Sequence, residues 1–228
     1  PNKRKINKKD IVSNKDYIKN ILYISLPNTS GRIITSIFYF LEPIIITLTL
    51  TKLGYTQNYI SIEYGIIEGY VIPLITLPNF FTIALSNSLL PTISNLYSKK
   101  DTKGVKRKLK QSIYISLFIG IITIISLFLF PNFFLKLIYN TNLGKNYLLI
   151  LLPSFILYYI EPPISSFLHG INKSKDLIKN ELIGISIKTL SLLTLPLFGF
   201  GIYSLIIGII LNIITKTILN YKTIKKSI

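Results

Sequence analysis

Two short motifs place a glutamate directly before a proline inside long apolar runs. They read YFLEPI, which contains Glu42, and YYIEPP, which contains Glu161. A carboxylate is costly in hydrocarbon and a proline interrupts helical hydrogen bonding, so packing alone explains neither choice. Two basic residues, Arg32 and Lys188, also fall inside apolar segments. These four charged side chains are therefore candidates for binding an ionic substrate or a coupling ion.

The two Glu-Pro segments each carry a stripe of polar side chains. At about 100° per residue along a helix, the polar residues of each segment fall within one narrow arc of the helix surface. The first stripe is Arg32, Thr35, Tyr39, Glu42 and Thr49, and the second is Ser154, Tyr158, Glu161, Ser165 and His169. A charge at the bilayer centre costs at least about 2.5 kcal/mol, so both stripes are predicted to face protein or water. The candidate substrate-binding or coupling residues are thus Arg32, Tyr39, Glu42, Tyr158, Glu161 and Lys188.

Structural roles for these residues remain open. Glu42 and Glu161 could be protonated carboxyls that join neighbouring helices, and Arg32 could cap a helix break or snorkel to the membrane surface. Arg32 and Glu42 lie about 15 Å apart along one helix, so each needs a partner elsewhere. Four further residues near the expected helix ends are interpreted as solvated or capping groups: Glu63, Glu68, Glu181 and His169.

The composition is that of a membrane protein. Of 228 residues, 50% are hydrophobic and only 15% are charged, and the mean hydropathy is +0.51, whereas soluble domains average about 25% charged. With no cysteine and one histidine, thiolate sites and histidine clusters are excluded, and we expect no metal site and no cofactor beyond a possible coupling H⁺ or Na⁺. The net charge of +17 falls in blocks between apolar runs without a nucleic-acid-binding motif, so we expect no nucleic acid partner.

Six segments are long and apolar enough to cross a bilayer as helices. They lie near residues 21–50, 64–97, 111–130, 146–169, 177–196 and 201–220. The second contains Pro73, Pro78 and Pro91, which predict a bent helix whose freed carbonyls are covered by neighbouring helices or face a cavity. The expected fold is an all-α integral membrane protein with six transmembrane helices.

The basic residues predict the orientation of these helices. Twenty-one of them fall within 3–19, 99–110, 173–179 and 216–226, which six crossings place on one side, and only Lys52, Lys136 and Lys145 fall on the other. Lys and Arg accumulate on the cytoplasmic side of short loops. We therefore expect a multi-pass protein of the cell membrane with a basic cytoplasmic linker at 1–20, a six-helix lobe at 21–222, and a cytoplasmic tail or the start of a missing segment at 223–228.

Motifs of enzymatic chemistry are missing from the sequence. It contains no Gly-rich phosphate loop, no HExxH and no GxSxG, and the expected loops are short. We therefore expect that the chain is not an enzyme.

Two stretches resemble a known family. They are LPNTSGRIITSIFYFLEPIII at 26–46 and GYVIPLITLPNFFTIALSNSLLPTISNLYSKKD at 69–101. Both are similar to the polysaccharide exporters of the stage V sporulation protein B type, in the multidrug/oligosaccharidyl-lipid/polysaccharide (MOP, MATE-like) exporter superfamily. The resemblance implies two six-helix lobes around a central cavity, with this chain as the C-terminal lobe and an N-terminal lobe upstream.

The same resemblance implies a flippase function. Such a protein would move a lipid-linked oligosaccharide or polysaccharide precursor across the membrane by alternating access, and Arg32 and Glu42 match the family motif. Glu161 and Lys188 rest on the residues alone. Arg32 and Lys188 lead us to expect a net positive cavity in the full protein. Two other functions stay open: an ion-coupled multidrug/cation antiporter, and a non-transporting membrane scaffold in cell-envelope or spore-wall synthesis.

Overall fold

The computed structural model describes residues 8–227, with side chains from residue 29 onward. Within this range the chain consists of helices joined by short turns, without strands. The elements are α1 (Lys8–Lys52), α2 (Gln57–Ile66), a π-helical turn (Ile67–Val71), α3 (Ile72–Thr76), α4 (Asn79–Ser98), α5 (Thr102–Leu129), α6 (Pro131–Tyr139), α7 (Lys145–Gly170), α8 (Ser174–Thr194), a 3-10 turn (Leu195–Phe198) and α9 (Tyr203–Ser227). Residues 1–7 of the expected linker lie outside the described residues, and residues 8–20 begin α1.

The number of membrane crossings agrees with the expectation from sequence. Among the described residues five helices are long and apolar enough to span a bilayer, and the bent pair of 57–76 and 79–98 brings the number to six when it is counted as one broken span. The short helix α6 was not expected. It begins at Pro131, which is suited to a first helical position, and ends at Asn140 in the left-handed conformation.

The second span is broken where its prolines predicted a bend. Its two halves meet at Leu77 and Pro78 with a bend of 54°. The carbonyl of Ile75 at this break accepts a hydrogen bond of 2.6 Å from the Tyr159 hydroxyl of α7. A neighbouring helix thus covers a freed carbonyl, as expected, whereas Pro91 lies inside α4 without ending it.

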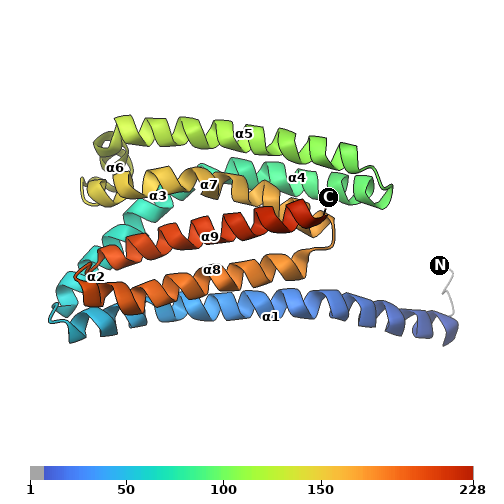
Figure 1. Ribbon diagram of the computed structural model, residues 1–228, viewed down its shortest axis with the longest axis horizontal. Helices are drawn as coiled ribbons and strands as arrows, with labels where there is room; N and C mark the ends of the chain where they lie inside the picture. The colour runs from blue at the N-terminus through green and yellow to red at the C-terminus, as the bar shows by residue number, and fades with distance from the viewer. Residues whose placement is uncertain (1–7, 228) are drawn as a thin grey trace, which may run out of the picture.

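The long helices lie roughly alongside one another in a bundle (Figure 1). Helix α8 packs between α1 and α9, α7 packs on α9, and α4 and α5 pack on α7. The segment α2–α3 crosses obliquely from the end of α1 toward α4. Helices α8 and α9 approach closely because Gly184 has no side chain: a Cβ there would lie 2.9 Å from Asn212 Oδ1.

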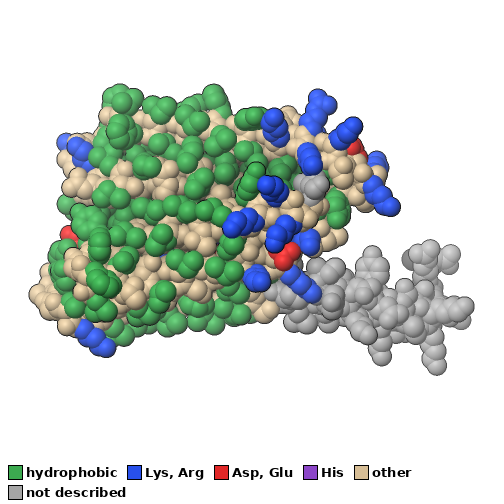
Figure 2. Space-filling view, viewed as in Figure 1, with side chains coloured by type: hydrophobic (Ala, Val, Ile, Leu, Met, Phe, Trp, Pro, Cys, Tyr) green, Lys and Arg blue, Asp and Glu red, His purple; other side chains and the backbone are tan. Residues whose placement is uncertain are grey.

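Two clusters of buried apolar side chains hold the bundle together. The larger includes Ile46, Ile67 and Phe155, and the smaller includes Leu109, Phe167 and Ile224. Many large apolar side chains are instead exposed, and they cover much of the face shown in Figure 2. This outer surface suits contact with lipid, which makes the chain an integral membrane protein.

One end of the bundle, called the basic end below, carries the basic stretches 99–110, 173–179 and 222–226 and lies where α1 begins and α9 ends (Figures 1 and 2). The stretch 99–110, expected as a loop, is mostly helical. The Asp101 carboxylate accepts a hydrogen bond of 2.8 Å from the Gly104 N–H and so starts α5 at Thr102. The basic residues from Lys103 to Lys110 therefore lie on the surface of α5, whereas Lys99 and Lys100 lie in the turn before it.

Candidate functional site

A buried ion pair joins α1 to α8. The Lys188 ammonium lies 2.7 Å from Glu42 Oε2, and both side chains are only 6% exposed. Helix α9 passes close by, because a Cβ at Gly208 would lie 3.2 Å from Lys188 Cγ. Glu42 of the Glu-Pro motif in α1 is thus paired with Lys188, which lies far along the sequence in α8. Neither charge needs to face lipid.

A second carboxyl group, Glu68 of the π-helical turn, lies beside this pair. Its side chain interacts with both the Glu42 carboxylate and the Lys188 ammonium. Among the described residues no donor bonds Glu42 Oε1. Glu68 was expected to be a solvated or capping group near the membrane surface, and that interpretation is wrong. Two carboxyl groups thus lie within electrostatic range of one ammonium, although of the two only Glu42 forms an ion pair with it.

The second Glu-Pro motif belongs to another charged cluster, centred on Lys216 of α9. The Lys216 ammonium lies 3.0 Å from Glu181 Oε2 and 3.7 Å from Glu161 Oε1. Glu161 also accepts a hydrogen bond of 3.2 Å from the Ser165 hydroxyl. Lys216 was counted among the basic residues of the membrane surface and Glu181 among solvated groups. Both interpretations are wrong, because the two side chains pair with each other inside the bundle.

Two tyrosines connect these clusters. The Lys188 ammonium lies 5.5 Å from the centre of the Tyr39 ring. Tyr39 also interacts electrostatically with Glu42, Glu181 and Lys216. Tyr158 of α7 interacts with Lys216 and Glu161. A continuous set of ionisable and hydroxyl groups therefore runs through the bundle between α1, α7, α8 and α9.

A polar pocket of about 420 Å³ lies next to these groups, on the side nearer the basic end of the bundle. It is lined by Gly31, Arg32, Thr35, Ser36, Tyr39, Ser165, His169, Leu177, Ile178 and Glu181. His169 at the end of α7 is 2.8 Å from the Ser174 hydroxyl, through Nδ1. The parts of the α1 and α7 polar stripes nearest the basic end thus face one pocket, with Arg32 as its cation and Glu181 as its link to Lys216.

Comparison with known proteins decides the family. A model of the MatE family matches residues 31–190, more than half of the chain. The chain belongs to the MatE family. It is 29% identical over 219 residues to Stage V sporulation protein B of Bacillus subtilis (strain 168), covering 95% of this chain and 42% of that protein. It is 26% identical over 220 residues to Sporulation protein YkvU of the same strain, covering 94% of this chain and 48% of that protein.

The MatE chain spans less than half the length of these curated relatives. No solved structure matches it. The MatE match confirms the MATE-like resemblance and the all-helical membrane fold inferred from sequence, and it runs from the second half of α1 to most of α8.

The structure brings the six candidate residues of this MatE chain into one region. Glu42, Lys188 and Tyr39 meet at the first cluster, Glu161 and Tyr158 at the second, and Arg32 lies in the adjoining pocket. Their roles stay predictions. Sequence reasoning missed Glu68, Glu181 and Lys216. The sequence did offer a sign that Lys216 is buried, because it lies inside the last apolar segment, 201–220, and not after it.

The charges of this half do not supply the positive excess expected for the full cavity. Four carboxyl groups, Glu42, Glu68, Glu161 and Glu181, face three basic ones. No group of three or more His, Cys, Asp or Glu side chains among residues 29–227 is arranged to hold a metal ion. The carboxylates of Glu42, Glu161 and Glu181 form ion pairs with lysine ammonium groups.

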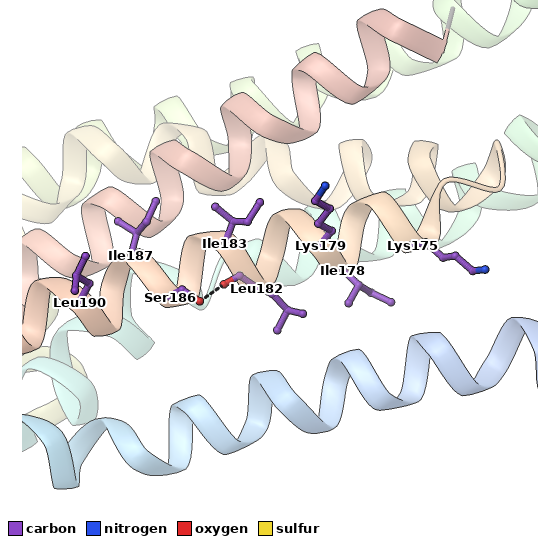
Figure 3. Close-up of a pocket in the computed structure, with 8 residues that line it drawn as sticks. All are labelled: Lys175, Ile178, Lys179, Leu182, Ile183, Ser186, Ile187 and Leu190. Carbon is purple, nitrogen blue, oxygen red and sulfur yellow. Dashed lines mark hydrogen bonds between the residues drawn. The ribbon is translucent and has the colours of Figure 1, made fainter.

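A shallow groove of about 570 Å³ runs along the outer face of α8 (Figure 3). Its lining is Lys175, Ile178, Lys179, Leu182, Ile183, Ser186, Ile187 and Leu190. The two lysines lie toward the basic end, and the rest is almost wholly apolar. Ile178 lines both this groove and the polar pocket and lies against Gly31 of α1, so the two spaces adjoin at the line of contact between α1 and α8, called the α1–α8 seam below.

Proposed function

We propose that this MatE chain is one lobe of a transporter that moves a lipid-linked saccharide with an anionic diphosphate head group across the cell membrane. Membership of the MatE family and the similarity to Stage V sporulation protein B support membrane transport. The main support for an anionic substrate is the pocket between α1, α7 and α8. In it, Arg32 lies among hydroxyl groups, and Glu181 of the same pocket forms an ion pair with Lys216.

Arg32 is the first contact for the diphosphate. A guanidinium offers two parallel, charge-assisted hydrogen bonds to phosphate oxygens, which replace hydration lost in the pocket. The hydroxyl groups of Ser36 and Tyr39 line the same pocket and offer further donors. The saccharide then lies in a polar space and avoids the hydrocarbon.

Exchange of ion pairs couples binding to protons. A diphosphate that enters from the Arg32 side competes with Glu161 and Glu181 for the Lys216 ammonium. Carboxylates released from Lys216 lose their compensation, so they take up a proton from the wet pocket. Release of the substrate on the other side restores the Lys216 contacts and expels that proton.

The lipid tail stays outside the pocket. The groove on α8 is apolar along most of its length and shares Ile178 with the pocket. A polyprenyl chain can lie in this groove or in lipid while the head group is bound on the other side of the α1–α8 seam. An amphipathic substrate matches this pairing of a polar and an apolar space.

The antiporter is the second candidate. It is disfavoured because Lys188 and Lys216 already form ion pairs with Glu42 and Glu161, and a cationic drug or Na⁺ would have to displace an ammonium. A scaffold makes no use of buried ion pairs, which are weak sources of stability.

Transport by the full protein in proteoliposomes tests the proposal. Arg32→Gln should reduce translocation of a fluorescent polyprenyl diphosphate saccharide at least tenfold, because one charge-assisted phosphate contact is worth about 1.5 to 3 kcal/mol. Arg107→Gln, an exposed arginine of α5, is the matched control and should leave transport unchanged.

Three outcomes would contradict this assignment. Equal loss in both variants would show a general charge effect. Cation efflux that survives Arg32→Gln but disappears in Glu42→Gln would favour the antiporter. Absence of any transport by the unaltered protein would favour the scaffold.

A further inference from the structure

A separate basic pocket of about 400 Å³ lies between α5 and α9 at the basic end. Its lining is Lys106, Leu109, Lys110, Ile113, Tyr114, Tyr221, Ile224 and Lys225. Helices α5 and α9 both pack against α7, and the space between their ends forms the pocket. The substrate pocket is built by α1, α7 and α8, so the two sites share no lining residue.

The pocket has a charged rim and an apolar floor. Leu109 and Ile224 are buried and belong to the smaller apolar cluster, while the three lysines are exposed. Lys106 and Lys110 come from α5 and Lys225 from α9, so the positive charge converges from two helices. Among the residues that line this pocket none is acidic.

The order of side chains along both helices matches the layers of a phospholipid leaflet. On α5, Lys110 is followed one turn deeper by Tyr114 and another turn deeper by the exposed Phe118. On α9, Lys225 is preceded one turn deeper by Tyr221 and then by the exposed Ile218. Ammonium groups suit phosphate, tyrosine suits the interface, and exposed apolar side chains suit acyl chains. The Lys110 ammonium lies 5.6 Å from the Tyr114 ring centre, which keeps both side chains on the rim.

We propose that this pocket binds one anionic phospholipid of the adjoining leaflet, with its phosphate held by Lys106, Lys110 and Lys225 and its acyl chains along Tyr114 and Tyr221. Charge complementarity selects the head group, because three lysines without an acid repel cationic lipids and gain little from zwitterionic ones. The acyl chains run parallel to α5 and α9, so the lipid fills a space on the lipid-facing surface that protein does not occupy.

The test measures lipid retained by the purified full protein, by native mass spectrometry with phosphatidylglycerol and phosphatidylcholine. The variant K106Q/K110Q/K225Q should weaken phosphatidylglycerol binding about a hundredfold, at about fivefold per lysine near the membrane surface. The control K99Q/K103Q/K108Q removes three exposed lysines from the same end outside the pocket and should change binding less than threefold.

A second variant keeps the charge and removes part of the wall. Tyr221→Ala should weaken phosphatidylglycerol binding severalfold, while the elution profile in size-exclusion chromatography stays that of the unaltered protein. Equal loss in the pocket and control variants would overturn the site in favour of general electrostatic attraction. Equal retention of phosphatidylcholine would overturn the head-group selection. A polyprenyl phosphate that displaces phosphatidylglycerol at equal concentration would overturn the phospholipid assignment in favour of the transported lipid.

Discussion

At the residue scale, the buried pair of Glu42 and Lys188 decides whether two charges can lie inside a membrane protein. Their side chains are almost completely shielded, and the 2.7 Å contact compensates each charge. Such a pair contributes little net stability compared with apolar residues, but the loss of one partner leaves an uncompensated buried charge. The pair therefore behaves as a unit.

Lys188→Met should destabilise the protein by about 3 to 5 kcal/mol, because Glu42 then lacks its counter-ion. Adding Glu42→Gln to form E42Q/K188M should recover most of that loss. The measurement is the temperature at which the detergent-solubilised protein loses its size-exclusion peak. Lys179→Met, at an exposed position of α8, is the control and should have little effect. Equal destabilisation in the single and double variants would contradict the pairing.

Glu68 is the carboxyl group that we expect to link the first cluster to protons. Because the Glu42 and Glu68 carboxyl groups repel each other beside the Lys188 ammonium, a proton on one of them relieves that repulsion. Glu68→Gln keeps a donor toward Glu42 but cannot exchange a proton. The rate of transport should then lose most of its dependence on a proton gradient across the proteoliposome.

Glu63→Gln is the matched control for this measurement. Glu63 accepts a hydrogen bond of 2.6 Å from the Tyr147 hydroxyl and is not part of the charged clusters described here. A proton dependence that survives Glu68→Gln, or that disappears equally in Glu63→Gln, would remove Glu68 from the coupling step.

At the element scale, the break in the second span shows how a membrane protein tolerates proline. Pro78 ends one helical hydrogen-bonding ladder, and Tyr159 supplies a donor to the Ile75 carbonyl from α7. An unsatisfied carbonyl in hydrocarbon is costly, so this bond holds the bend against α7.

Tyr159→Phe should lower stability by about 1 to 3 kcal/mol, because it leaves the Ile75 carbonyl unpaired while keeping the ring in place. The same thermal size-exclusion measurement applies, with Tyr97→Phe at an exposed position of α4 as the control. Equal effects of the two substitutions would show that the hydroxyl at the break is unimportant.

Gly31 allows α1 and α8 to pack closely at the α1–α8 seam. A Cβ at Gly31 would lie 2.2 Å from Ile178 Cγ2, and the β-branched Ile178 cannot easily move aside. Gly31→Ala should therefore separate the two helices and reduce transport. Adding Ile178→Ala should restore it by making room for the new methyl group. Failure of the second substitution to restore transport would show that Gly31 acts by some other means than close packing.

At the scale of the whole molecule, the separation of charge along the bundle indicates its orientation. Basic side chains gather at one end, and Lys52, Lys136 and Lys145 lie in segments near the other (Figure 2). Excess Lys and Arg favours the cytoplasmic side. Lys216 lies inside the bundle and no longer counts among the basic residues of this end, but the excess of basic residues there remains large.

Single cysteines test this orientation, since the chain has none of its own. Asn172→Cys at the basic end should react with a membrane-impermeant maleimide only after intact cells are permeabilised. Asn142→Cys, between α6 and α7, should react without permeabilisation. The reverse pattern would invert the expected topology, and equal labelling of both would contradict a fixed one.

Lipid chemistry explains why so much of this fold is readable from the amino-acid order. Each crossing needs a continuous apolar run, so the six spans follow from local hydropathy, and the prolines mark the bend. The polar stripes of α1 and α7 likewise follow from helical periodicity. Helix α6 was not predicted, because a nine-residue amphipathic helix between two spans has no such constraint.

Sequence by itself determined the class of protein, the spans and the fact that Arg32, Glu42, Glu161 and Lys188 need shelter from lipid. Only the tertiary structure decided their partners. It paired Glu42 with Lys188, added Glu68, and placed Lys216 between Glu161 and Glu181. The physical reason is that hydropathy acts on neighbouring residues along one helix, whereas a buried charge is satisfied across helices, at positions set by how they pack.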